Sequence, residues 1–251
     1  MKPVFSLFCL YLRHTFWKVL LLLLAAGAVE WGVFTARWQG LSYTPNLPEA
    51  YTQSRLPLDW LLVGVFLVLC LLLATATLAR GKARPGYTLC RLPLSPGQVL
   101  LGQGLWNTLA FLLFWGSQAL VFLGMAWSFG QGGGFLGPQT LPMAVWQVPR
   151  FYAFLPLGAP LQWLGNLALA LGLGFTAAAF TQALHRGKWT FAFPTLALCA
   201  LVCLGAAPLS FLAAGACLVW GLWQALRPEA PDRDDDNDGK EVAPHAPAET
   251  P

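Results

Sequence analysis

The chain alternates between long apolar stretches and short polar segments that are rich in glycine and proline. About 20 apolar residues in an α-helix cross the roughly 30 Å hydrocarbon core of a bilayer. Six stretches approach this length, and a very tight turn joins the last two. The pattern predicts an all-α, polytopic membrane protein with six transmembrane helices. They cover residues Trp17–Ala36, Trp60–Ala79, Val99–Trp127, Leu161–Ala183, Thr190–Ala206 and Leu209–Leu226.

Residues 1–18 carry a narrow polar stripe in an otherwise apolar pattern. On a helical projection this stripe contains Lys2, Ser6, Cys9 and Arg13. The pattern is typical of an amphipathic helix that lies in the membrane interface. The alternative is one helix over residues 4–36, about 50 Å long, which exceeds the thickness of the core. We predict an N-terminal interfacial amphipathic helix.

The composition agrees with a membrane protein. Hydrophobic residues make up 57% of the chain and charged residues 10%, whereas average soluble proteins carry about 25% charged residues. So few charges cannot cover a soluble globule, which argues against a soluble enzyme, a nucleic-acid-binding domain or a disordered regulator. We expect contact with membrane lipid and none with nucleic acid.

Charge divides the chain into two parts. Residues 1–226 contain twelve Lys and Arg residues and three acidic residues. Residues 227–251 contain three basic and eight acidic residues. The second part is rich in proline and alanine and has almost no large apolar residue, so it cannot bury a core. We predict a transmembrane domain at 1–226 and a disordered acidic cytoplasmic tail at 227–251.

The tail contains one motif that resembles a calcium loop. Asp234, Asp236, Asp238 and Gly239 match its D-x-D-x-D-G opening. The twelfth position, which needs a bidentate Glu, is His245, and prolines surround the run where helices are required. A solvated acidic tail is therefore preferred to a calcium site.

The basic residues near the span ends predict the orientation, because cytoplasmic loops carry an excess of Lys and Arg. Ten of them fall on one side and three on the other, which places both termini in the cytoplasm, in agreement with an even number of spans. We expect a bacterial plasma membrane. The larger group is Lys2, Arg13, Lys18, Arg80, Lys82, Arg84, Arg91, Arg186, Lys188 and Arg227, and the smaller is Arg37, Arg55 and Arg150.

Motifs for catalysis do not occur. The sequence has no HExxH and no GxSxG, and each Gly-Lys pair is followed by Ala, Trp or Glu instead of the Ser or Thr of a phosphate-binding loop. The six cysteines form no CxxC pair, which argues against a zinc site or a disulfide framework. We expect no catalytic residue, no metal site, no cofactor and no enzyme activity in this chain.

A few polar residues interrupt the predicted spans. Such residues usually face other helices or a water-filled path. Gln103, Asn107 and Gln118 project within about 60° of one another on a helix. Two interpretations of the amides stay open, namely interhelical hydrogen bonding and a translocation path. For Glu30, a water-accessible outer cavity is a further possibility. The candidates for the path are Glu30, Gln103, Asn107, Gln118, Gln162 and Asn166.

One string before the third span supports a family resemblance. Residues 87–99 read YTLCRLPLSPGQV, which is similar to the R-L-P-[IL]-S stretch of ABC transporter permease subunits of the ABC-2 (type V exporter) family. The layout of residues 1–226 resembles these permeases too. The resemblance implies that residues 1–226 are a permease domain that works with a separate ABC ATPase subunit and with a second permease subunit, in a homo- or heterodimer.

In that family the first cytoplasmic loop docks into the ATPase. Prolines stiffen such a loop, leucines offer apolar contacts and arginines offer ionic ones. The alternative is an ordinary basic loop on the cytoplasmic side. The residues that the resemblance assigns to docking are Arg84, Tyr87, Arg91, Leu92, Pro93, Leu94, Ser95 and Pro96.

Two other classes of function stay open. An intramembrane enzyme would need paired polar catalysts at one depth, and none is evident. A non-transporting membrane scaffold, sensor or immunity protein would share the same layout. We expect a permease subunit of an ATP-driven ABC exporter, and a neighbouring gene for an ATPase would separate it from the scaffold.

Overall fold

The computed structural model describes seven helices. It covers residues 2–40, 42–43, 46–75, 95–131, 148–185, 192–203 and 207–226, and within these ranges it contains no strand. The all-helical fold predicted from the apolar pattern is therefore confirmed for this part of the chain. The helices are α1 (Lys2–Gln39), α2 (Leu47–Thr75), α4 (Pro96–Gln131), α6 (Pro149–Phe154), α7 (Pro160–His185), α8 (Ala192–Cys203) and α9 (Ala207–Leu226).

Four helices are long and apolar enough to cross a membrane, namely α1, α2, α4 and α7. The chain thus has the make-up of an integral membrane protein. The fifth and sixth predicted spans correspond to α8 and α9, whose apolar helical segments are shorter. The twelve residues of α8 rise only about 18 Å. The structure supports four spans, and the count of six stays a prediction.

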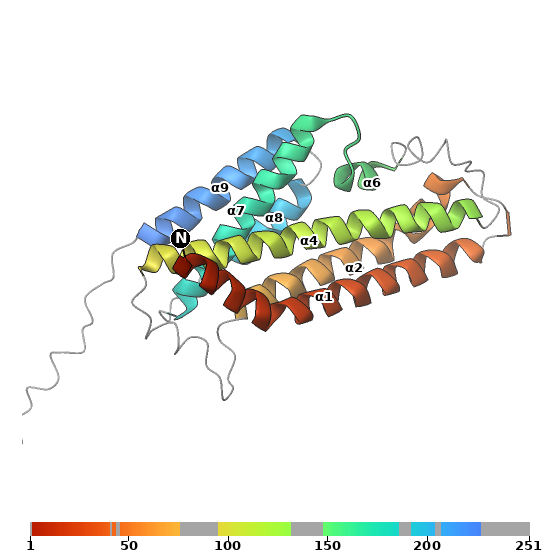
Figure 1. Ribbon diagram of the computed structural model, residues 1–251. Coiled ribbons are helices and arrows are strands. Elements are labelled where there is room, and N and C mark those ends of the chain that lie inside the picture. Colours follow the sequence, from red (N-terminus) through yellow and green to blue (C-terminus); the bar gives the residue numbers. More distant parts are fainter. Residues whose placement is uncertain are drawn as a thin grey trace, which may run out of the picture.

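The N-terminal residues belong to a longer helix than expected. Residues Lys2–Gln39 form one continuous helix of 38 residues, about 57 Å long, which changes direction along its N-terminal part (Figure 1). Its first turns pack against α4, where the Phe8 and Trp106 rings lie 6.2 Å apart. A separate interfacial helix is therefore not seen, because residues 2–18 continue into the rest of α1 without a break.

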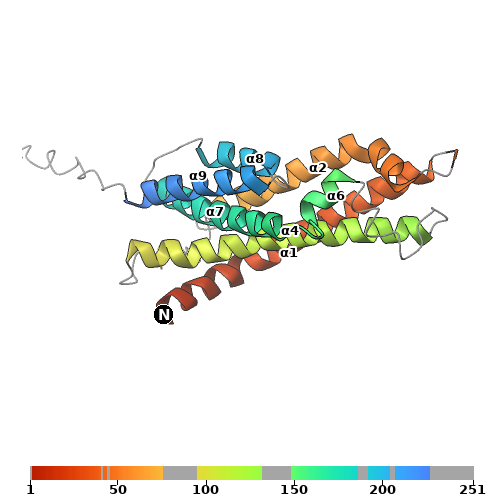
Figure 2. The same ribbon diagram turned by 90° about the horizontal axis from the view of Figure 1, so that it is seen from above.

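The long helices alternate in direction. Leu7 and Trp31 of α1 contact α4 at Gly102 and Gly124, so α1 and α4 run in parallel. Helix α2 runs the other way. Its residue Phe66 lies beside Phe111 and Phe114, while Tyr51, near its start, shares the contact of Phe151 with Phe122, near the end of α4. We call the end of the bundle where α1 and α4 finish the distal end. Figures 1 and 2 show α1, α2 and α4 side by side, with α7, α8 and α9 packed toward the opposite end.

Helices α4, α7 and α9 approach each other closely through glycines. A Cβ added at Gly174 of α7 would lie 2.6 Å from the Thr108 backbone nitrogen on α4, and one at Gly172 would lie 2.9 Å from the Ala214 carbonyl oxygen on α9. The Thr176 hydroxyl also donates to the Cys217 carbonyl, at 2.8 Å. Small residues at such crossings allow close packing without a hydrophobic driving force in lipid. Helix α7 is accordingly the most enclosed of the four long helices.

Both α2 and α4 begin with side-chain caps. At the start of α4, the Gln98 amide N–H donates to the Ser95 hydroxyl (3.4 Å), and the Ser95 amide N–H donates to the Gln98 side-chain oxygen (3.3 Å). This reciprocal pair is a capping box, and Pro96 occupies the first helical position, which proline favours. At the start of α2, the backbone N–H of Asn46 donates to the Glu49 carboxylate. These side-chain caps set the starts of α2 and α4.

Candidate functional site

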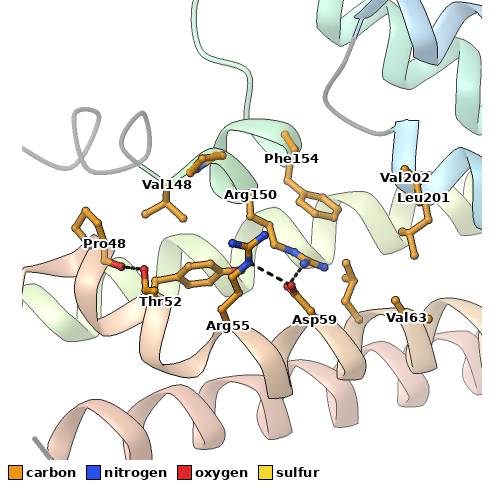
Figure 3. A pocket seen from close by; sticks show the side chains of 14 residues that line it. Pro48, Thr52, Arg55, Asp59, Val63, Val148, Arg150, Phe154, Leu201 and Val202 are labelled. Carbon is orange, nitrogen blue, oxygen red and sulfur yellow. Dashed lines mark hydrogen bonds and ion pairs between the residues drawn. The ribbon is translucent and has the colours of Figure 1, made fainter.

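A cavity of about 510 Å³ opens at the distal end (Figure 3). Its walls come from α2, α6 and the end of α8. One part carries charged and polar side chains and the rest is apolar. The lining residues are Pro48, Tyr51, Thr52, Arg55, Asp59, Leu62, Val63, Val148, Pro149, Arg150, Ala153, Phe154, Leu201 and Val202.

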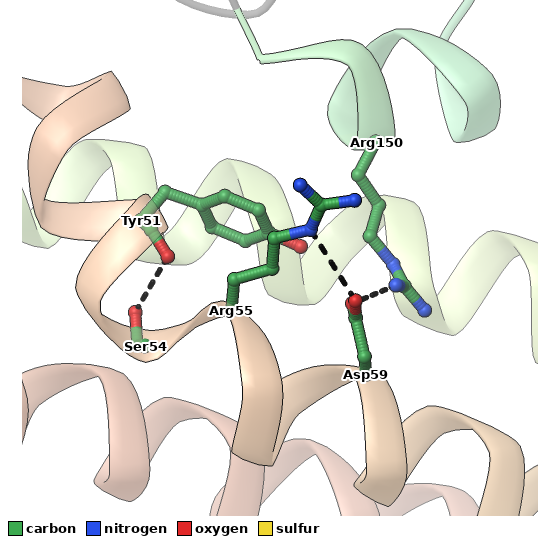
Figure 4. A network of polar contacts seen from close by, with 5 residues as sticks. All are labelled: Tyr51, Ser54, Arg55, Asp59 and Arg150. Atoms are coloured by element: carbon green, nitrogen blue, oxygen red, sulfur yellow. Dashed lines mark hydrogen bonds and ion pairs between the residues drawn. The ribbon is translucent and has the colours of Figure 1, made fainter.

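Two arginines share one carboxylate in this cavity (Figure 4). The Arg55 Nε atom lies 3.5 Å from Asp59 Oδ2, one turn along α2. Arg150 on α6 donates through Nη1 to Asp59 Oδ1. One carboxylate cannot accept all the N–H donors of two guanidinium groups, each of which has five. These three lining residues also leave one positive charge in excess.

Aromatic contacts hold α6, and with it Arg150, in place. The Phe151 ring lies 5.1 Å from Tyr51 on α2 and 4.7 Å from Phe122 on α4. Burial lowers the pKa of the Arg150 guanidinium, while the Tyr51 phenol and the Glu30 carboxylate act in the opposite direction. The guanidinium keeps its charge, because arginine is not deprotonated in proteins. The cavity therefore holds a fixed, half-buried cation.

A second polar pair lies in the interior between α1 and α4. The Gln118 side-chain amide donates to Glu30 Oε1 at 3.2 Å, and both residues are almost fully buried. Among the residues that the structure describes, Glu30 Oε2 and Gln118 Oε1 have no hydrogen-bond partner. Glu30 does not line the cavity, although its charge acts on Arg150.

The other four predicted path residues are also buried, but they are spread over several contacts. Asn107 donates to the Gly174 carbonyl on α7 (3.3 Å), and Asn166 donates to the Ala153 carbonyl on α6 (3.1 Å). Gln103 Nε2 has no hydrogen-bond partner within the described part of the chain. Gln162 is buried as well. The stripe on α4 thus divides, with Asn107 bonded to α7 and Gln118 to α1.

The predicted docking loop lies mostly outside the described residues, including Arg84, Tyr87, Arg91, Leu92, Pro93 and Leu94. Ser95 and Pro96 are described, at the exposed start of α4. The acidic tail with its calcium-like run also lies outside the described ranges. Within those ranges, no group of three His, Cys, Asp or Glu side chains could hold a metal ion.

Sequence reasoning did not assign Arg55, Asp59 and Arg150 to a site. Arg55 and Arg150 were interpreted only as orientation signals. One signal was available, because residues 1–226 hold just three acidic side chains and Asp59 follows Arg55 by one helical turn. Rare charges in apolar segments usually have partners. The contact with Arg150 could not be predicted, since it depends on where α6 folds back.

Comparison of the chain with protein-family models, with curated proteins and with solved structures gives no match.

Proposed function

We propose that the chain is the transmembrane permease subunit of an ATP-driven exporter of the ABC-2 kind. ATP hydrolysis takes place on a separate subunit that docks on the cytoplasmic loop before α4. Two permease subunits assemble in each transporter. Both termini lie in the cytoplasm of a bacterial cell.

The observation that supports this proposal best is the continuity of α4. This helix starts directly after the R-L-P-L-S string, and the capping box of Ser95 and Gln98 fixes its first turn. It then runs for 36 residues and carries Gln103, Asn107 and Gln118 into the interior. A helix transmits displacement along its axis because each turn is hydrogen-bonded to the next. A push on the loop would therefore reach the buried polar contacts with α1 and α7.

One observation favours the non-transporting alternative. Asn107, Gln118 and Asn166 each donate to another segment of the same chain. Such contacts also occur in membrane bundles that do not move. A scaffold, sensor or immunity protein would keep these contacts and would not need an ATPase. The decisive experiment must therefore test the partner.

The test is co-purification with the product of a neighbouring gene that encodes an ATPase with a G-x-x-x-x-G-K-[ST] motif. Leu92→Asp and Leu94→Asp together put two charges into the proposed apolar contact, where a buried unpaired charge costs several kcal/mol. We expect the ATPase to be recovered with the unaltered chain and lost with the double variant, while membrane insertion is unchanged.

A matched control places the same charges elsewhere. Leu136→Asp with Leu141→Asp changes two leucines in a loop predicted to lie on the opposite side of the membrane. This variant should retain the ATPase. Equal recovery with both double variants would remove the loop from the interface. The absence of ATPase with the unaltered chain would favour the scaffold.

A further inference from the structure

The cavity at the distal end has two chemically different parts. Arg55, Asp59 and Arg150 form the polar part, and the rest of the wall is mostly apolar (Figure 3). Leu62 and Val63 lie about two turns further along α2 than Arg55, a rise of about 10–12 Å. Small-molecule sites typically measure about 300–1,000 Å³ and combine apolar walls with a few polar groups, and this cavity of about 510 Å³ fits that description.

The polar part has donors that its own carboxylate cannot satisfy. Asp59 is shared by two guanidiniums, and Arg55 contacts it through Nε alone, at 3.5 Å. The Arg55 side chain is 69% exposed, against 23% for Arg150. Guanidinium groups bind phosphate and carboxylate oxygens in pairs of N–H bonds. An incoming anionic group could therefore contact Arg55 from solvent and compete with Asp59 for Arg150.

The apolar part of the cavity adjoins exposed apolar side chains. Val202, on the wall formed by α8, is 84% exposed, and Trp60, next to Asp59 on α2, is 74% exposed. Tryptophan gathers where lipid headgroups meet hydrocarbon. If α2 crosses the membrane, as its length and composition allow, Trp60 places Asp59 near headgroup depth, and Leu62 and Val63 then lie deeper along the same helix.

We propose that this cavity binds an amphiphile with an anionic headgroup and an alkyl chain. The headgroup pairs with Arg55 and Arg150, and the chain lies along Leu62 and Val63 of α2 and the end of α8. Asp59 holds the two arginines when the amphiphile is absent and competes with the headgroup. This site is independent of the transport proposal, because binding is a property of the isolated chain.

The test measures binding of dodecyl phosphate to the full chain in dodecyl maltoside micelles by native mass spectrometry. The micelle supplies a neutral amphiphile of equal chain length, so binding must depend on the anionic group. We expect one molecule per chain, with at least tenfold weaker binding in Arg55→Gln and in Arg150→Gln. Asp59→Asn removes the competing carboxylate and should bind at least severalfold more tightly.

Two controls make the result decisive. Arg37→Gln removes an exposed cation at the same end of the bundle, outside the cavity, and should bind like the unaltered chain. Inorganic phosphate lacks the alkyl chain and should not bind measurably. If inorganic phosphate bound as tightly as dodecyl phosphate, the proposal that the ligand needs an alkyl chain would be wrong. If Arg37→Gln weakened binding as much as Arg55→Gln, the proposed location of the site would be wrong. Because Arg55 is exposed, its variant should fold, and unchanged binding in Arg55→Gln would overturn the proposal even if Arg150→Gln were unstable.

Discussion

Arg150 on α6 donates a hydrogen bond to Asp59 on α2, which lies 91 residues earlier in the chain. Arg55 reaches the same carboxylate from one turn away. Two of the three basic residues outside the predicted cytoplasmic group therefore meet at one acid. Their charges are engaged with a carboxylate of the protein, which is compatible with their predicted place on the side where basic residues are rare.

The first prediction concerns this ion pair. Both side chains are half-buried. Removing Asp59 leaves Arg150 without its counter-ion, and removing Arg150 leaves Asp59 with only the looser contact to Arg55, at 3.5 Å. We expect Asp59→Asn and Arg150→Gln each to lower the free energy of unfolding by about 1.5–3 kcal/mol. The double variant should lose less than the sum, because the second change removes the stranded charge. Chemical unfolding in detergent measures all three, and Arg37→Gln should change little. Strict additivity would contradict the pairing.

The second prediction concerns the buried pair of Glu30 and Gln118. Glu30→Gln keeps the shape and can still accept from the Gln118 amide, while its new N–H₂ group can donate to Gln118 Oε1, which has no partner. We expect this variant to be at least as stable as the unaltered chain. Gln118→Leu removes the hydrogen bond that the Gln118 amide donates to the carboxylate and should cost about 1–3 kcal/mol. Thermal unfolding in detergent measures the unfolding temperature of both variants. A lower unfolding temperature for Glu30→Gln than for Gln118→Leu would contradict this prediction.

The third prediction concerns the crossing of α4 and α7. A methyl group at Gly174 would lie 2.8 Å from the Thr108 Cα atom, so the two backbones must separate. We expect Gly174→Ala to destabilise the bundle by about 1–3 kcal/mol, as overpacking does. A Cβ at Gly116, also on α4, would meet nothing within 4 Å. Gly116→Ala should therefore be neutral or stabilising by up to about 1 kcal/mol. Equal effects of the two substitutions on the unfolding midpoint would exclude a close crossing.

Much of the helical fold could be predicted, because a run of apolar residues long enough to cross a bilayer has few other stable arrangements. Residues Trp17–Ala36 and Leu161–Ala183 fall inside α1 and α7 as expected. The start of α4 was predicted to within a few residues, at Val99 against Pro96. The N-terminal end of α1 was not predicted correctly. A polar stripe in the sequence does not reveal whether a neighbouring helix covers the apolar face.

The candidate site was less predictable. The projection of Gln103, Asn107 and Gln118 placed them on one stripe, and all three are indeed buried. Their hydrogen-bond partners depend on which helices lie beside α4 at each level. A projection of one helix carries no information about its neighbours. The cavity depends on α6, six residues long, which leaves no periodic signal that could be distinguished from a loop.

The fourth prediction concerns orientation. Helices α1 and α4 start at the same end of the bundle and α2 starts at the other, so one measurement fixes the direction of all three. The ten-to-three excess of basic residues predicts that the distal end faces outward. In a chain whose native cysteines are replaced, we expect an impermeant maleimide to label Asn46→Cys in intact cells. Pro85→Cys should react only after the membrane is permeabilised. The reverse pattern would contradict the predicted orientation, and the cavity of Arg55, Asp59 and Arg150 would then open toward the cytoplasmic leaflet instead of the outer one.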